Sequence, residues 1–293
     1  MPVRDILIAV LVTCIWGTNF VVIHYGLQYF PPFLFAALRF ILTFLPWAFF
    51  FKKPDIPVKY LMLNGFFLGF GQFGILFFAL QGYISPGIAS LLMQSQIFFS
   101  LFLSFIIFKD VPNKYQLISI TICIIGFILI AMSGIQNNVG NITIIGLGLC
   151  LIASFSWACS NIVARKVGKV KMMNFLIWGS LYSSIPLSFM SLFLDGIDAI
   201  IDSISKAPFY AWASILWQSI GNTLLGFSLW FWLMYKHGTT VVSPLSLLVP
   251  VFGMLSAFLI LNERLHLYEG LAALLIMTGL SLNIYFSNKK FTS

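Results

Sequence analysis

Long apolar runs separated by short polar connections make up almost the whole chain. A helix that crosses the hydrocarbon core of a bilayer needs about 20 apolar residues. Ten runs of suitable length lie between the charged residues, prolines and glycines, at residues 6–26, 33–51, 60–81, 86–107, 115–133, 142–163, 173–194, 208–234, 239–261 and 268–287. The pattern therefore predicts an all-α integral membrane protein with ten transmembrane helices.

The second half of the chain repeats the first. A shift of 153 positions places residues 90–127 over residues 243–280, and it also places Asp110 over Glu263. Each half contains five runs, an odd number, so the second half should enter the membrane from the opposite side. We therefore expect two inverted repeats, each of five transmembrane helices, around a central cavity.

The boundaries of these repeats follow from the runs. The first repeat is expected over residues 5–134 and the second over residues 142–288. Inverted repeats are typical of transporters in which a substrate site near the middle of the membrane opens alternately to each side. The repeat thus predicts a transporter, whose partners are the lipid bilayer and a small-molecule substrate.

Composition and charge agree with a membrane protein. Sixty per cent of the residues are hydrophobic and 8% are charged, which excludes a water-soluble domain of this length. The net charge of +8 does not indicate nucleic-acid binding, because the basic residues occur singly or in pairs between the runs. Most of them fall on one side of the predicted membrane, which places both termini in the cytoplasm.

Polar side chains inside the runs are the candidate functional residues, since polar groups in hydrocarbon must face another helix or a water-filled cavity. The first group of substrate-binding candidates combines amide and indole side chains, at Asn19, Gln94, Asn161, Trp16, Trp157 and Trp230. A second group contains further polar side chains, at Gln72, Gln96, Ser90, Asn222 and Ser243. The alternative for each asparagine is a hydrogen bond to a neighbouring helix, which is common in membrane proteins.

Two prolines and three charged residues are candidates for gating or charge roles. Pro244 and Pro250 free backbone carbonyls in the ninth run, where they either allow a gate to bend or merely kink the helix. Arg39 could bind a substrate carboxylate, pair with an acid such as Glu269, or extend towards the membrane surface. Glu263 and Glu269 lie near the outer boundary, so proton coupling through an acidic side chain would have to use them.

Other motifs are absent from the sequence. There is no G-x-x-x-x-G-K-[ST] phosphate loop, no H-E-x-x-H and no G-x-S-x-G, and the four cysteines lack metal-binding spacing. We therefore expect no enzyme activity, no metal and no cofactor. The expected cavity is neutral, rich in amides and walled by aromatic residues, which suits a small zwitterion or an uncharged polar metabolite.

Several motifs resemble those of a known family. They are "WGTNFVVIHYGL" followed by "PP" and "LRF", "GIASLLMQSQ", "FSWACSNI", and "PLSLLVPVFG" followed by "NERL". With them, nearly the whole chain resembles the EamA-domain branch of the drug/metabolite transporter (DMT) superfamily. The resemblance implies efflux of amino-acid metabolites such as O-acetylserine and cysteine across a bacterial inner membrane. One departure is "FKDVPN" in the first half, where the branch usually has an acidic-arginine pair like Glu263 and Arg264.

Two alternatives stay open from the sequence. The high phenylalanine and tryptophan content also suits an exporter of drugs or bulky aromatic compounds. An alternative of another class is a membrane-embedded enzyme or scaffold that transports nothing, against which the repeat and the missing catalytic motifs argue. The sequence does not distinguish a monomer from a homodimer, and it does not identify the substrate or a coupling ion.

Overall fold

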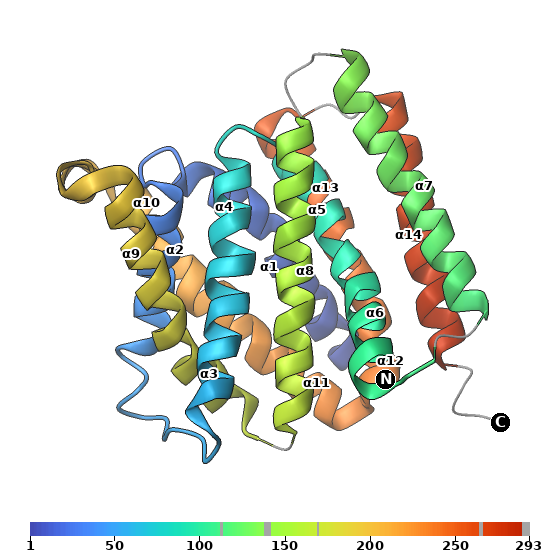
Figure 1. Cartoon of the computed structure of the whole chain (residues 1–293), viewed down its shortest axis with the longest axis horizontal. Coiled ribbons are helices and arrows are strands. Elements are labelled where there is room, and N and C mark those ends of the chain that lie inside the picture. Colours follow the sequence, from blue (N-terminus) through green and yellow to red (C-terminus); the bar gives the residue numbers. More distant parts are fainter. Residues whose placement is uncertain (112–113, 138–141, 169, 264–265, 289–293) are drawn as a thin grey trace.

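The fold is known from a computed structural model, which describes residues 1–111, 114–137, 142–168, 170–263 and 266–288. Within these ranges the chain forms a bundle of helices, and the start of α1 and the end of α14 lie at the same end of it (Figure 1). We call this the N-terminal end and the opposite one the far end. The α-helices are α1 (Val3–Gly26), α2 (Pro32–Phe44), α3 (Val58–Asn64), α4 (Ile75–Leu80), α5 (Pro86–Leu92), α6 (Gln96–Phe108), α7 (Lys114–Asn137), α8 (Ile144–Val167), α9 (Met172–Lys206), α10 (Phe209–Leu216), α11 (Gly226–His237), α12 (Thr239–Val242), α13 (Leu248–Leu261) and α14 (Leu267–Asn288).

Helix length and composition agree with a multi-pass membrane protein. Among the described residues, six helical stretches are long and apolar enough to cross a bilayer, at Val3–Gly26, Val58–Leu80, Pro86–Phe108, Lys114–Met132, Ile144–Val167 and Met172–Lys206. Shorter apolar helices cover Pro32–Phe44, Leu245–Leu261 and Leu267–Asn283. The described residues contain no β-strand, and an isolated bridge joins Ile84 to Ile142.

In four of the long helical stretches the helix type changes partway along. The π-helix η1 (Gly65–Gly74) joins α3 to α4, and the π-helix η3 (Trp217–Leu225) joins α10 to α11. The 3₁₀ segments η2 (Met93–Ser95) and η4 (Ser243–Leu247) precede α6 and α13. A shift of 153 positions brings each interruption of the first half onto or next to its equivalent in the second half. Such interruptions are frequent at functional sites.

Two helix boundaries differ from the pattern of apolar residues. The second run was expected to continue to residue 51, but α2 ends at Phe44, because Pro46 lacks the amide hydrogen that the next helical turn requires. The stretch after Leu194 was expected to be a connection, but it is helical to Lys206. A break occurs within it at Gly196, whose φ of 78° and ψ of 164° suit a residue without a Cβ atom.

Neighbouring helices approach each other closely at glycine residues. A Cβ atom on Gly17 of α1 would lie 2.5 Å from the Cβ atom of Phe252 on α13. A Cβ atom on Gly279 of α14 would lie 2.4 Å from the Sγ atom of Cys123 on α7. Small residues at these crossings let the helix backbones pack closely, which is the usual means of helix association in membranes.

Candidate functional site

Trp16 of α1 lies in an aromatic cluster formed with α11. Its ring centroid is 5.1 Å from that of Phe227 and 5.2 Å from that of Trp230. Its Nε1–H donates a hydrogen bond of 3.2 Å to the backbone carbonyl of Asn222 in η3. Gly226 permits this approach, since a Cβ atom there would lie 2.6 Å from the indole nitrogen. The structure thus brings together three predicted residues, Trp16, Asn222 and Trp230.

Asn19 lies about one helical turn beyond Trp16 and is buried against η3. Its side-chain amide donates to the Oε1 atom of Gln218 at 3.2 Å and accepts from the Nε2 atom of the same residue at 2.8 Å. The two amides therefore satisfy each other across a helix interface. The interhelical alternative describes Asn19 in this structure.

Arg39 of α2 is fully buried beside this amide pair. Its Nη1 atom donates to Gln218 Oε1 at 3.0 Å, and its Nε and Nη2 atoms donate to Thr223 Oγ1 at 3.3 and 2.9 Å. The guanidinium also stacks over the ring of Phe73, 3.7 Å from the centroid. Of the possibilities for Arg39, the structure shows neither a pairing with Glu269 nor extension to the membrane surface, because the side chain is fully buried and its hydrogen-bond partners within the described chain are neutral.

Asn161, the counterpart of Asn19 in the second half, has a different environment. Its side chain is exposed, and its Nδ2 atom donates to Gln96 Oε1 at 2.9 Å and to Ser100 Oγ at 3.4 Å on α6. Trp157, on the same helix, is half-buried and packs against the main hydrophobic core. Asn161 and Gln96 therefore form a polar group that a molecule entering between α6 and α8 could reach.

Other predicted residues are buried. Gln72 in η1 is 4% exposed, and within the described chain its Oε1 atom has no hydrogen-bond partner. Gln94 is also 4% exposed. Ser90 donates to a carbonyl of its own helix and fills the space beside Gly253, which indicates a packing role. Pro250 is buried in the first turn of α13, where its missing amide hydrogen costs little.

For three further residues named in the sequence analysis, the structure does not describe the side chain. The side chains of Ser243, Pro244 and Arg264 lie outside the described part of the structure.

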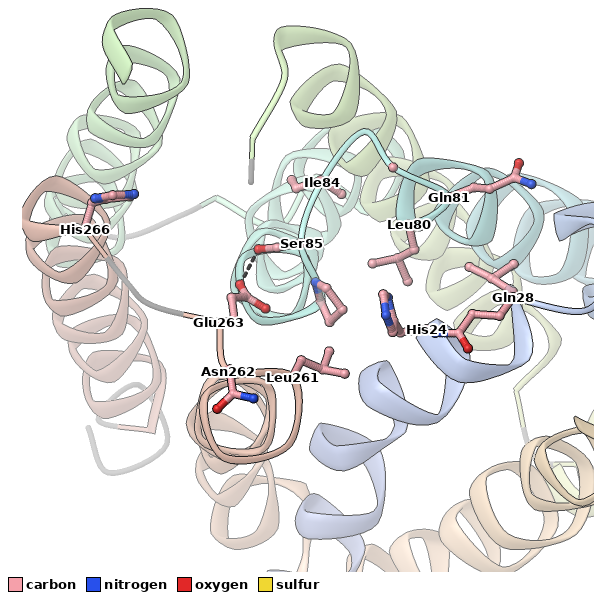
Figure 2. Close-up of a pocket in the computed structure, with 13 residues that line it drawn as sticks. His24, Gln28, Leu80, Gln81, Ile84, Ser85, Leu261, Asn262, Glu263 and His266 are labelled. Carbon is pink, nitrogen blue, oxygen red and sulfur yellow. Dashed lines mark hydrogen bonds between the residues drawn. The ribbon is translucent and has the colours of Figure 1, made fainter. Parts of the chain in front are cut away.

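A separate pocket of about 760 Å³ opens at the far end of the bundle (Figure 2). His24 and Gln28 line it from α1, Ser85 from the connection before α5, and Glu263 from the end of α13. The carboxylate of Glu263 accepts hydrogen bonds from Ser85 Oγ and from the backbone amide of Gly87, the latter at 3.2 Å. Burial raises the pKa of the Glu263 carboxyl, and these hydrogen bonds oppose the increase.

Glu269 has a local role near this pocket. Its Oε2 atom accepts a hydrogen bond of 2.8 Å from the backbone amide of His266, three residues earlier. The carboxylate therefore satisfies a backbone donor at the start of α14, as acidic residues commonly do in the first turn of a helix.

Several residues that complete these clusters are not among the candidates predicted from the sequence. Gln218 and Thr223 lie in "WQSIGNT", whose density of polar residues within an apolar run is a usable signal. Asp5 directly precedes the first run; it is 1% exposed and accepts hydrogen bonds from Lys236 at 2.8 Å and His237 at 2.6 Å. These bonds tie the start of α1 to the end of α11.

Comparison with known proteins adds a family match. The profile of the EamA-like transporter family matches residues 4–132 and again residues 144–285. The chain is 37% identical over 289 residues to a protein of Salmonella typhimurium named "Probable amino-acid metabolite efflux pump", covering 97% of this chain and 96% of that one. A protein of Escherichia coli (strain K12) with the same name has the same identity and coverage.

A solved structure also resembles the fold. It is titled "Crystal structure of protein", covers 98% of this chain and 99% of its own, and gives a TM-score of 0.61 at 14% sequence identity. At this identity the likeness concerns the arrangement of the helices alone.

Proposed function

Because the chain belongs to the EamA-like transporter family, we propose that it exports small amino acids or amino-acid metabolites from the cytoplasm by alternating access. The observation that carries this proposal is the correspondence of η1 with η3 and of η2 with η4. Interrupted helices at equivalent places of two repeats mark the substrate region of many transporters. Here η3 holds the buried group around Gln218, and α6, which follows η2, holds the group around Gln96.

The same correspondence supports the proposed topology. In it, ten transmembrane helices form two inverted five-helix repeats, over residues 5–134 and 142–288. The N-terminal end of the bundle faces the cytoplasm of a bacterium, and the protein lies in the inner membrane. The excess of lysine and arginine in the connections at that end supports this orientation.

We assign direct substrate contact to the group formed by Asn161, Gln96 and Ser100. An amide can donate to the carboxylate of an amino acid and accept from its ammonium group, so this neutral group suits a zwitterion. Trp157 forms a wall beside it, and Trp16 and Trp230 form the aromatic wall on the side of α1.

Asn19 and Arg39 are assigned a positioning role through Gln218, because both are buried and bound to it. Bending of the ninth span at Pro244 and Pro250 and contacts from further polar side chains remain predictions, the latter for Gln72, Ser90, Gln94, Asn222 and Ser243.

Efflux assays test the proposal. Inverted vesicles containing the protein are offered cysteine, O-acetylserine, threonine, phenylalanine and a bulky organic cation, with and without a pH gradient. We expect uptake of the small polar compounds and at least a tenfold loss in Asn161→Ala. The matched control is Asn174→Ala, because Asn174 donates a hydrogen bond to the carbonyl of Lys52 in a connection away from the group.

Two results would contradict the proposal. Movement of the bulky aromatic compounds alone would favour the aromatic-compound exporter, for which the cluster of Trp16, Phe227 and Trp230 offers stacking surfaces. No movement of any compound would favour a membrane protein without transport activity.

A further inference from the structure

Helices α6 and α13 end in the same way. Each ends in a left-handed residue, Lys109 with φ 61° and ψ 26° and Asn262 with φ 55° and ψ 28°. The next residue is acidic in both, Asp110 and Glu263, and its backbone amide donates to the carbonyl six residues earlier, at 3.4 and 3.2 Å. The two carboxylates therefore leave their helices from equivalent positions at opposite ends of the bundle.

The side chains of these two residues nevertheless bind different partners. At the far end, Glu263 accepts hydrogen bonds from Ser85 Oγ and the amide of Gly87, so it fastens α13 to the start of α5 (Figure 2). At the N-terminal end, Asp110 forms an ion pair of 2.6 Å with Arg165 near the end of α8, and both side chains are about half exposed. The two equivalent carboxylates thus form different contacts: Glu263 joins two helices at its end of the bundle, and Asp110 forms an exposed ion pair.

Each partner has a counterpart in the other half. The shift of 153 positions that relates Asp110 to Glu263 places Gly87 at residue 240, in the first turn of α12. Arg165 lies in the last turn of α8, and His24 lies in the last turn of α1, the helix that begins the first half as α8 begins the second. His24 lines the same pocket as Glu263 and points into it from α1 (Figure 2). The repeat therefore predicts a second set of partners for each carboxylate within its own end of the bundle.

We propose that Glu263 and Asp110 are alternating latches, each of which closes one end of the transporter and is released when the other closes. This inference rests on the proposed alternating access. In the present state Glu263 binds the start of α5 and Asp110 binds Arg165. In the opposite state Glu263 binds His24, and Asp110 binds the backbone amides at the start of α12.

The packing beneath Glu263 shows why such a latch would control access. A Cβ atom on Gly87 would lie 3.3 Å from the Cβ atom of Ala257 on α13, so α5 and α13 touch directly below the carboxylate. Ala257 is 1% exposed and Ile88 is fully buried. Release of Glu263 would let these two helices part and would expose Ala257 to water.

Labelling of a cysteine at position 257 measures this opening. The four native cysteines are replaced by alanine, Ala257→Cys is added, and the rate of reaction with a maleimide is measured on purified protein in detergent without substrate. Glu263→Ala should raise the rate about tenfold, since hydrogen bonds to a charged group stabilise the closed end by more than an exposed ion pair does. Asp110→Ala should lower the rate, because it removes the latch of the opposite state.

The partner residues should have smaller effects, also of opposite sign. Arg165→Ala should raise the labelling rate about twofold, in the range of an exposed ion pair, and His24→Ala should lower it. The matched control is Asp202→Ala, which removes an exposed carboxylate paired with Lys206 at 2.6 Å and should leave the rate unchanged. If Glu263→Ala does not yield folded protein, Glu263→Gln retains an acceptor oxygen and should raise the rate to a smaller extent.

Opposite shifts in Glu263→Ala and Asp110→Ala support the latches. Equal rates in all variants, or shifts of the same sign, overturn them. Because the labelling needs no substrate, it is independent of the efflux assay. Opposite shifts without export of any tested compound would support the latches and contradict the proposed substrates. Export of these compounds without the shifts would contradict the latches alone.

Discussion

Replacing Gln218 by leucine should destabilise the protein more than removal of any neighbour in its network. Gln218 takes part in three hydrogen bonds, two with the amide of Asn19 and one with the Nη1 atom of Arg39. Leucine has a similar volume and makes none of them. The change therefore leaves a buried amide unpaired, and a fully buried guanidinium retains Thr223 and the ring faces of Phe73 and Phe40.

The magnitude follows from the number and kind of these bonds. Hydrogen bonds between membrane helices contribute on average about 0.6 kcal/mol each, which gives about 2 kcal/mol for three. A hydrogen bond to a charged group is worth more, about 1.5 to 3 kcal/mol, so the bond to Arg39 raises this sum. We expect Gln218→Leu to lower the free energy of unfolding by about 3 kcal/mol.

A second substitution separates the charge from the lost contacts. The double variant Arg39→Leu/Gln218→Leu also removes the buried cation that has lost a hydrogen-bond acceptor, so it should be more stable than Gln218→Leu alone, by about 1 to 2 kcal/mol. The measurement is reversible unfolding in mixed micelles of mild detergent and dodecyl sulfate, followed by tryptophan fluorescence. If the two substitutions were simply additive, or if Gln218→Leu were as stable as the parent, the assignment of Gln218 as the counter-group of Arg39 would be refuted.

Three further changes test the packing and the caps. Gly279→Val should destabilise the contact of α14 with α7 by about 1 to 3 kcal/mol, because its Cβ atom would overlap Cys123, whereas Gly148→Ala has open space and should be neutral or stabilising in the same unfolding assay. Thr143→Ala removes the side-chain cap of α8, whose Oγ1 atom accepts from a backbone amide at 2.9 Å, and should cost about 1 kcal/mol. Trp16→Phe keeps the aromatic contacts but loses the bond to the carbonyl in η3, so it should cost about 1 kcal/mol.

The sequence predicted the helical class well, because apolar runs of membrane length leave few alternatives. It did not predict every helix end. Pro46 and Gly196 each change the course of the backbone, and the pattern of apolar residues does not predict either change. The family resemblance read from motifs such as "FSWACSNI" is confirmed by the family match and by the 37% identical relatives.

The site was harder to predict, because helical periodicity gives the face of a side chain and does not identify its neighbour. Asn19 and Asn161 occupy equivalent places in the two halves, yet one is buried against Gln218 and the other is exposed beside Gln96. Arg39 was expected to need an acid or water, but neutral oxygens and an aromatic ring surround it. Long-range contacts of this kind depend on how the two halves pack, which no local pattern encodes.

The pairing of α7 with α14 also has a consequence for how the protein is made. These helices pack along their length, with the rings of Tyr115 and Phe286 stacked 4.1 Å apart, and Figure 1 shows them side by side at one edge of the bundle. They lie at Lys114–Asn137 and Leu267–Asn288, so α7 leaves the ribosome long before its partner exists. During synthesis the face of α7 that will meet α14 must therefore stay in contact with lipid or with the insertion machinery. The insertion of α14 into the membrane is then the moment at which α7 obtains its final neighbour.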